Sequence, residues 1–248
     1  MPELVRVDVV DGIGTITLDS PHNRNALSRQ LLQELNECLE VCESARAIVL
    51  RHEGPTFCSG ADLKERSDPN SPPDSRPMVT VLERLMDGPC PTIAAIDGTV
   101  RAGGIGLMAA CDLSVVAPAT TFALTEVRIG VAAAVISVPI LRKVSPGKIA
   151  TAMFTGEPFD AEYAQTIGLV THVADDVAGT VRALCDSIRP GSPRAIAATK
   201  RLLRIVPTLD RTTAFAEMRA LSDELFRGAD AAEGMAAFRE KRPPVWPG

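Results

Sequence analysis

"VRAGGIGLMAACD" (residues 100–112) places three glycines within four positions, directly before an apolar, helix-like run. Glycine costs about 0.5–1 kcal/mol relative to alanine inside regular structure, so Gly103, Gly104 and Gly106 require a reason. One reason is a turn that brings backbone N–H groups close to a ligand, since a helix N-terminus offers unpaired donors and a favourable dipole. The other is tight strand–helix packing, which accounts for one glycine more readily than for three.

The segments around this turn alternate between strand and helix patterns. Residues 4–18 contain two alternating apolar runs around Asp11-Gly12, which predicts a hairpin. Residues 25–42 place leucines at helical spacing, with Ser28 as the expected N-cap. Apolar strands are predicted at residues 47–52, 92–97 and 113–117. The recurrence of strand, turn and helix predicts an α/β fold with a mostly parallel sheet.

Composition narrows the class of protein. The net charge of −5 argues against a general nucleic-acid-binding role, and 46% apolar residues are enough to form a core. The N-terminus lacks the pattern of a signal peptide, and the longest apolar run, residues 130–141, is too short to cross a bilayer. We therefore expect a cytoplasmic protein with no membrane partner. The six cysteines lack a C-x-x-C pair, so we expect buried free thiols and no metal site.

A second glycine turn lies in "PTFCSGADL" (residues 55–63). Ser59 is not predicted to be a nucleophile, because the G-x-S-x-G pattern is absent. Two turns that each present N–H groups can converge on one carbonyl oxygen and form an oxyanion hole. In such a site, the loss of one donor costs about 2.7–4 kcal/mol of transition-state stabilisation. The weaker alternative is a dinucleotide site, since "GIGLMA" (104–109) fits G-x-G-x-x-A but the next strand ends in Ala117-Pro118 without the expected acid.

Glu126 in "TFALTEVRIG" is the candidate for proton transfer. A carboxylate beside apolar surface is disfavoured in its charged form, which raises its pKa and suits acid–base work near neutral pH. The alternative is an ordinary glutamate at a helix entry that pairs with Arg128. Local sequence leaves both open.

Six segments, in one order along the chain, resemble those of the crotonase (enoyl-CoA hydratase/isomerase) family. They are "PHNRNALS" (21–28), "FCSGADLKE" (57–65), "DGTVRAGGIGLMAACDLSVVA" (97–117), "FALTEVRIGV" (122–131), "FTGEPFDAEYAQTIGLVTHV" (154–173) and "GMAAFREKRPPVW" (234–246). The resemblance implies a spiral of ββα units in a core over residues 1–174, followed by a helical region over 175–248 that covers the site and mediates oligomerisation. It also implies an acyl-coenzyme A substrate, no further cofactor, and a homotrimer or dimer of trimers.

The same resemblance assigns roles to residues. The backbone N–H groups of Ser59 and Gly103 are the implied oxyanion pair, and Glu126 is the implied proton-transfer group. Arg24 and Lys64 are expected at the phosphates of coenzyme A, and Phe238 and Lys241 at its adenosine end. The remaining expected lining residues are Ala26, Gly60, Ala61, Asp62, Leu63, Gly104 and Gly106.

One departure from the family pattern affects the expected reaction. Hydratases of this family carry two catalytic glutamates, and the first falls on Gly106 in this chain. We therefore expect an enoyl-CoA hydratase/isomerase-type enzyme that forms an enolate with a single glutamate, and Gly106 is expected to leave space for a bulkier acyl group. A one-glutamate hydratase, an isomerase, thioester hydrolysis, C–C cleavage and a non-catalytic acyl-CoA-binding subunit stay open.

Overall fold

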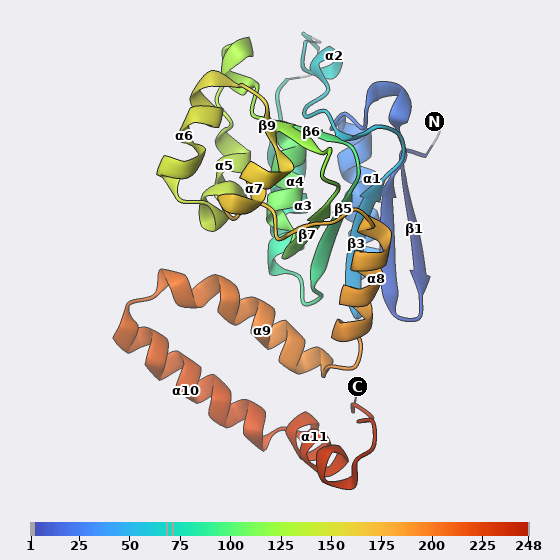
Figure 1. Ribbon diagram of the computed structural model, residues 1–248, viewed down its shortest axis with the longest axis vertical. Helices are drawn as coiled ribbons and strands as arrows, with labels where there is room; N and C mark the ends of the chain where they lie inside the picture. The colour runs from blue at the N-terminus through green and yellow to red at the C-terminus, as the bar shows by residue number, and fades with distance from the viewer. Residues whose placement is uncertain (1–2, 68, 71, 248) are drawn as a thin grey trace.

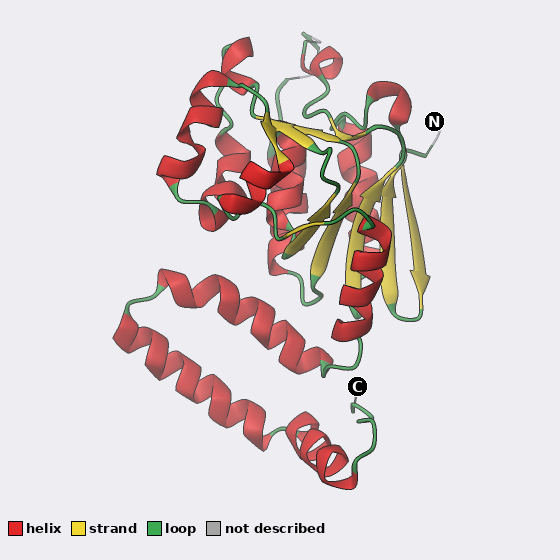
Figure 2. Cartoon of the chain, viewed as in Figure 1, coloured by secondary structure: helices red, strands yellow, loops and turns green. Residues whose placement is uncertain are grey.

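Two β-sheets form the centre of the fold, and a computed structural model describes residues 3–67, 69–70 and 72–247 of the chain (Figures 1 and 2). The larger sheet has the order β1-β2-β3-β5-β7-β10, in which only the β1–β2 pair is antiparallel. Its strands are β1 (Val5–Val10), β2 (Ile13–Leu18), β3 (Ala47–His52), β5 (Thr92–Ile96), β7 (Leu113–Val116) and β10 (His172–Val173).

The smaller sheet has the order β4-β6-β8-β9, and its first three strands run parallel. Its strands are β4 (Thr56–Cys58), β6 (Thr99–Arg101), β8 (Thr121–Ala123) and β9 (Phe159–Asp160). The pairs β3–β4, β5–β6 and β7–β8 each place a longer strand in the first sheet and the following short strand in the second, before the chain turns into a helix or 3₁₀ turn. This is the expected spiral of ββα units. The short strands of the second sheet were not resolved as separate elements by the sequence patterns, because three residues are too few to show a period.

The hairpin and the helix start that were predicted from local residues are both present in the structure. Asp11 and Gly12 take positive φ values of 50° and 77° at the hairpin between β1 and β2. The Ser28 side chain accepts a hydrogen bond of 3.1 Å from the Leu31 N–H and caps α1. All six cysteines are free and buried, as expected.

Helices cover the sheets and form the C-terminal region (Figure 1). Those of the core are α1 (Arg29–Val41), α2 (Leu63–Arg66), α3 (Arg76–Asp87), α4 (Gly103–Ala110), α5 (Ala134–Lys143), α6 (Pro146–Thr155), α7 (Ala161–Thr166) and α8 (Val177–Ile188). Those that follow are α9 (Pro193–Ile205), α10 (Arg211–Arg227) and α11 (Ala229–Glu240). In the described part of the chain, no helix is long and apolar enough to cross a bilayer.

The described helices after β10 divide into one that packs on the core and three that extend from it. Helix α8 packs its buried residues Val181 and Cys185 against the larger sheet, so it belongs to the core. Helices α9–α11 instead extend from the core as an arm, on the side of the molecule away from α2 (Figure 1). The division at residue 174 stays a prediction, and the arm within the helical region begins at α9.

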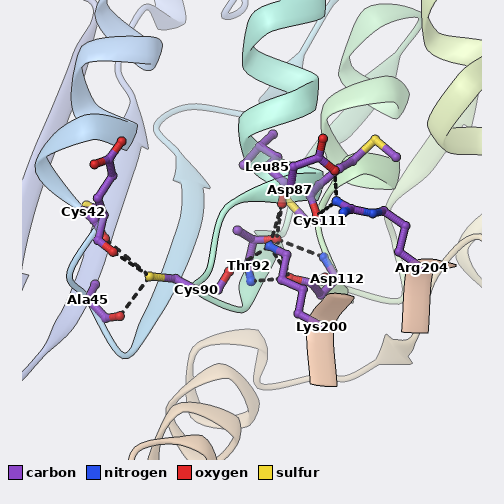
Figure 3. Close-up of polar contacts among 12 residues, drawn as sticks. Cys42, Ala45, Leu85, Asp87, Cys90, Thr92, Cys111, Asp112, Lys200 and Arg204 are labelled. Atoms are coloured by element: carbon purple, nitrogen blue, oxygen red, sulfur yellow. Dashed lines mark hydrogen bonds and ion pairs between the residues drawn. The ribbon is translucent and has the colours of Figure 1, made fainter. Parts of the chain in front are cut away.

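A cluster of polar contacts joins the arm to the core (Figure 3). Lys200 is the buried residue of α9, and its ammonium group lies 2.7 Å from the Leu85 carbonyl, 2.8 Å from the Cys90 carbonyl and 2.9 Å from the Asp112 carboxylate. Arg204, one turn later, contacts the Met86 carbonyl at 3.0 Å. Asp112 follows the C-terminal end of α4, so the arm is joined to the core at the end of α4 opposite Gly103.

Candidate active site

Three chain turns meet at one edge of the smaller sheet. Strands β4, β6 and β8 are parallel, so their carboxyl ends lie at the same edge, where ligand sites of parallel sheets usually form. Ser59 follows β4, Ala102 follows β6, and Glu126 lies three residues after β8. The Ala102 N–H donates to the Ala123 carbonyl at 2.9 Å and joins the last two turns. The two glycine turns and Glu126, which are far apart in sequence, are thus neighbours.

The segment over residues 24–27 lies against the turn after β4. Leu27 and Ala61 form a parallel bridge, in which the Leu27 N–H donates to the Gly60 carbonyl at 2.8 Å. The Ser59 N–H donates to the Arg24 carbonyl at 3.1 Å. The structure therefore brings together the first two segments that the resemblance placed around coenzyme A.

The donor assigned to Ser59 is corrected by this geometry. Its N–H is already used by the Arg24 carbonyl and cannot serve an oxyanion without losing that bond. Among the residues that the structure describes, the N–H groups of Ala61 and Gly103 donate to no protein acceptor. Ala61 is free because a parallel bridge engages the residues on either side of it, and Gly103 is free because it opens a helix.

Close approach of the two turns requires glycine at two positions. Gly60 has a φ of +93°, and a Cβ there would lie 2.8 Å from the Ala102 Cβ. A Cβ on Gly103 would lie 2.7 Å from the Leu27 Cδ1, with the Ala61 nitrogen 3.9 Å away. Ala102 itself has a φ of 47°, which is a strained conformation for a residue with a side chain. The two free N–H groups are held next to each other by this packing.

Glu126 opens a 3₁₀ turn, Glu126–Ile129, and is half-buried. Its Oε2 atom is buried and has no hydrogen-bond partner within the described residues. Burial raises the pKa of this carboxyl above its usual value of 4.5, because the charged form loses hydration, although its own backbone N–H partly opposes the shift.

The expected alternative, a pair between Glu126 and Arg128, is wrong. The Arg128 guanidinium contacts Glu157 at 2.5 Å and the Thr155 carbonyl at 3.0 Å. Glu126 is therefore not held as a structural ion pair with that arginine.

The two later glycines of the opening stretch are explained by packing. A Cβ on Gly104 would lie 2.7 Å from the Cys58 Cβ, which lets α4 pack closely on the end of β4. A Cβ on Gly106 would lie 2.3 Å from Cγ2 and 2.7 Å from Cβ of Ile136 on α5. The expectation that Gly106 leaves space for a bulkier acyl group is therefore wrong, because Ile136 already fills that space.

The other expected lining residues divide into two groups. Arg24, Leu63 and Lys64 are exposed around the site, and Ala26 is buried beside it. The Asp62 carboxylate accepts N–H bonds from Lys64 and Glu65 at 3.0 and 3.3 Å, so it caps α2. Asp62 thus has a structural role that the resemblance did not assign.

Phe238 and Lys241 are not brought to this site in the same chain. Both lie at the C-terminal end of α11 in the arm, and Phe238 is 87% exposed. In Figure 1 this helix lies at the opposite end of the molecule from α2, where Lys64 is located. The expectation that the helical region covers the site is therefore wrong within one chain.

Sequence reasoning missed three features of the site: the free N–H of Ala61, the strained Ala102 and the side chain of Ile136. All three depend on how distant segments pack. The assembled geometry offers two N–H donors at the same sheet edge as a half-buried carboxylate, whose Oε2 atom has no partner among the described residues. Such a site can stabilise a negative oxygen while it removes a proton from the neighbouring carbon.

Known proteins resemble this chain over nearly its whole length. The family model described as "Enoyl-CoA hydratase/isomerase" matches residues 8–248. The chain is 32% identical to the enoyl-CoA isomerase/hydratase fer4 of Mycosarcoma maydis, over 96% of this chain and 93% of that protein. It is 31% identical to the mitochondrial methylglutaconyl-CoA hydratase of Mus musculus, over 96% and 80% respectively. The crystal structure of an enoyl-CoA hydratase from Mycobacterium smegmatis superposes with a TM-score of 0.90 at 31% identity, covering 98% of both chains.

Proposed function

The chain belongs to the enoyl-CoA hydratase/isomerase family, and we propose that it converts enoyl-coenzyme A thioesters through an enolate formed by Glu126. The observation that carries the proposal is the buried, unpartnered Oε2 of Glu126 at the same sheet edge as the free N–H groups of Ala61 and Gly103. A carboxylate buried without a partner is costly, and such groups are concentrated at functional sites.

In the proposed mechanism, the thioester oxygen accepts hydrogen bonds from Ala61 and Gly103. Negative charge builds on this oxygen when Glu126 removes a proton from the α-carbon, so the two donors stabilise the enolate more than the thioester. The raised pKa of Glu126 makes its ionised form a stronger base than an exposed carboxylate. The proposed oxyanion donors are thus Ala61 and Gly103, in place of the expected Ser59 and Gly103.

We assign Arg24 and Lys64, exposed on either side of the oxyanion turn, to the phosphates of coenzyme A. Phe238 and Lys241 lie too far along the arm to serve the same chain, so we assign them to the coenzyme A site of a neighbouring copy. This assignment agrees with the expected homotrimer or dimer of trimers. Light scattering of the purified protein tests it, and a stable monomer with full activity would contradict it.

Hydrogen exchange at the α-carbon tests the role of Glu126 directly. The purified protein is incubated with an acyl-CoA thioester in D₂O, and deuterium at the α-carbon is followed by NMR. We expect Glu126→Gln to lower the exchange rate by about 10²- to 10⁴-fold, the usual contribution of a general base. Glu157→Gln is the matched control, because Glu157 is exposed and pairs with Arg128.

Calorimetric binding of the same thioester separates the alternatives. Retained binding together with lost exchange in Glu126→Gln supports the proposal. Exchange by Glu126→Gln at the wild-type rate refutes it. Tight binding by wild type, without exchange or conversion of any enoyl thioester, favours a non-catalytic acyl-CoA-binding subunit. Release of free coenzyme A by wild type favours thioester hydrolysis.

A further inference from the structure

The contact between Gly106 and Ile136 lies one helical turn after the proposed oxyanion donor Gly103. Ile136 lies on α5, is 5% exposed and places Cγ2 2.3 Å from the position of a Cβ on Gly106. Such a distance is far below van der Waals contact, so α4 and α5 can pack this closely only because residue 106 has no side chain. Ile136 therefore occupies the place that a side chain on residue 106 would take.

A side chain on residue 106 would point toward the turn that presents the Gly103 N–H. Gly106 lies one turn after Gly103, so both are on the same face of α4. Because Cα–Cβ bonds in an α-helix tilt toward its N-terminus, a side chain at residue 106 would extend over the Gly103 N–H. Ile136 occupies the start of that path. The remaining residues of α4, Ile105 and Leu107 to Ala110, carry no acid or base either.

We infer that Ile136 determines the reaction specificity of this site, because its side chain occupies the place from which a second carboxylate or a held water would act. The inference rests on the proposed function of Glu126 and selects one reaction from those that an enolate permits. It assigns to this chain the migration of a double bond in an enoyl thioester and excludes efficient addition of water.

The favoured reaction needs a single base and balances without a co-reactant. Glu126 takes a proton from C2 of a 3-enoyl thioester, and the C–H electron pair enters the dienolate whose oxygen is held by Ala61 and Gly103. The same carboxyl then returns the proton to C4. The carbonyl re-forms and the double bond moves to C2=C3. Water addition instead needs a group that orients and deprotonates water at C3, and an isoleucine side chain cannot do this.

The first experiment uses wild-type protein and isotopic water. Unlabelled 3-hexenoyl-CoA and 2-hexenoyl-CoA are incubated separately in H₂¹⁸O, and the products are analysed by mass spectrometry and NMR. We expect migration of the double bond to exceed ¹⁸O incorporation by at least about 10²-fold, the lower range of a general-base contribution. Incorporation of ¹⁸O at a rate comparable to migration overturns the inference. That result leaves the role of Glu126 intact, whereas absence of α-proton exchange in the wild-type protein would defeat the proposed function itself.

The second experiment removes the Ile136 side chain and adds a side chain at residue 106. In Gly106→Glu/Ile136→Ala, a carboxylate enters the space that the isoleucine vacates. We expect a rise in water addition of about 10²-fold over Gly106→Gln/Ile136→Ala, which has the same shape but no base. Ile140→Ala, one turn further along α5, is the control for loss of a buried isoleucine whose atoms are not among those nearest to Gly106, and we expect no gain. Equal water addition by the Glu and Gln variants overturns the inference; should the double variants not fold, the wild-type isotope result decides it alone.

Discussion

Replacement of Lys200 by methionine should release the C-terminal arm from the core. Lys200 is 7% exposed and is the buried residue of α9, while α10 has no buried residue within the described chain. Its ammonium group is shared by the Leu85 carbonyl, the Cys90 carbonyl and the Asp112 carboxylate (Figure 3). Methionine retains most of the apolar stem and removes all three interactions.

The expected loss follows from these contacts. Hydrogen bonds to a charged group contribute about 1.5–3 kcal/mol each, and removal of one partner from a buried ion pair costs about 3–5 kcal/mol. The Asp112 side chain is 29% exposed and keeps its hydrogen bonds to the Thr92 N–H and hydroxyl, so part of its cost is recovered. We therefore expect about 3 kcal/mol, at the lower end of the range for a buried pair.

Two measurements check this loss. Urea denaturation reports the free energy of unfolding, and limited trypsin digestion after Arg194 reports opening of the first turn of α9, because Ala195 follows Arg194 there. Arg204→Met on the same helix is the control: Arg204 and its partner Asp87 are more exposed, so its loss should cost less than about 1 kcal/mol. If Lys200→Met changes the unfolding free energy no more than Arg204→Met and leaves digestion unchanged, the arm is held by something other than this cluster.

Four further predictions concern the site. Because burial raises the pKa of Glu126, kcat/KM for proton transfer should rise with pH through a value above 4.5; an inflection at or below that value contradicts the assigned base. A raised pKa means that the folded state binds this proton more tightly than the unfolded state does. The ionised Glu126 therefore lowers the free energy of unfolding above its folded pKa, and this effect disappears below its unfolded pKa. Glu126→Gln should therefore raise the Tm at pH 7, and the difference from wild type should shrink toward pH 4. Gly60→Ala should cost about 1–3 kcal/mol and lower kcat more than it raises KM, because φ is +93° and Ala102 lies within 2.8 Å of the new Cβ; wild-type kcat would show that the turn tolerates a side chain. Arg128→Ala should change stability by less than about 1 kcal/mol and leave α-proton exchange unchanged, since its partner Glu157 is 68% exposed; a loss of exchange would reconnect Arg128 with Glu126.

Sequence alone determined the elements whose signals are local. Asp11-Gly12 specifies a hairpin because its φ values favour these residue types, and Ser28 begins a helix because its hydroxyl reaches the Leu31 N–H. The order of motifs also determined the family and its ββα spiral, because each motif keeps its own spacing. Glu126 could be singled out by its apolar neighbours before its burial was known.

Only the tertiary structure decided which groups of the site are available. Ser59 and Ala61 are equally good donors by sequence, and a carbonyl from a distant segment uses the first and leaves the second free. Gly106 suggests an empty space by sequence, yet Ile136 from the next helix fills it. The arm is recognisable as helical, but its buried lysine decides where it docks. Hydrogen-bond use and cavity volume depend on neighbours brought together by folding, and no local pattern in the chain encodes them.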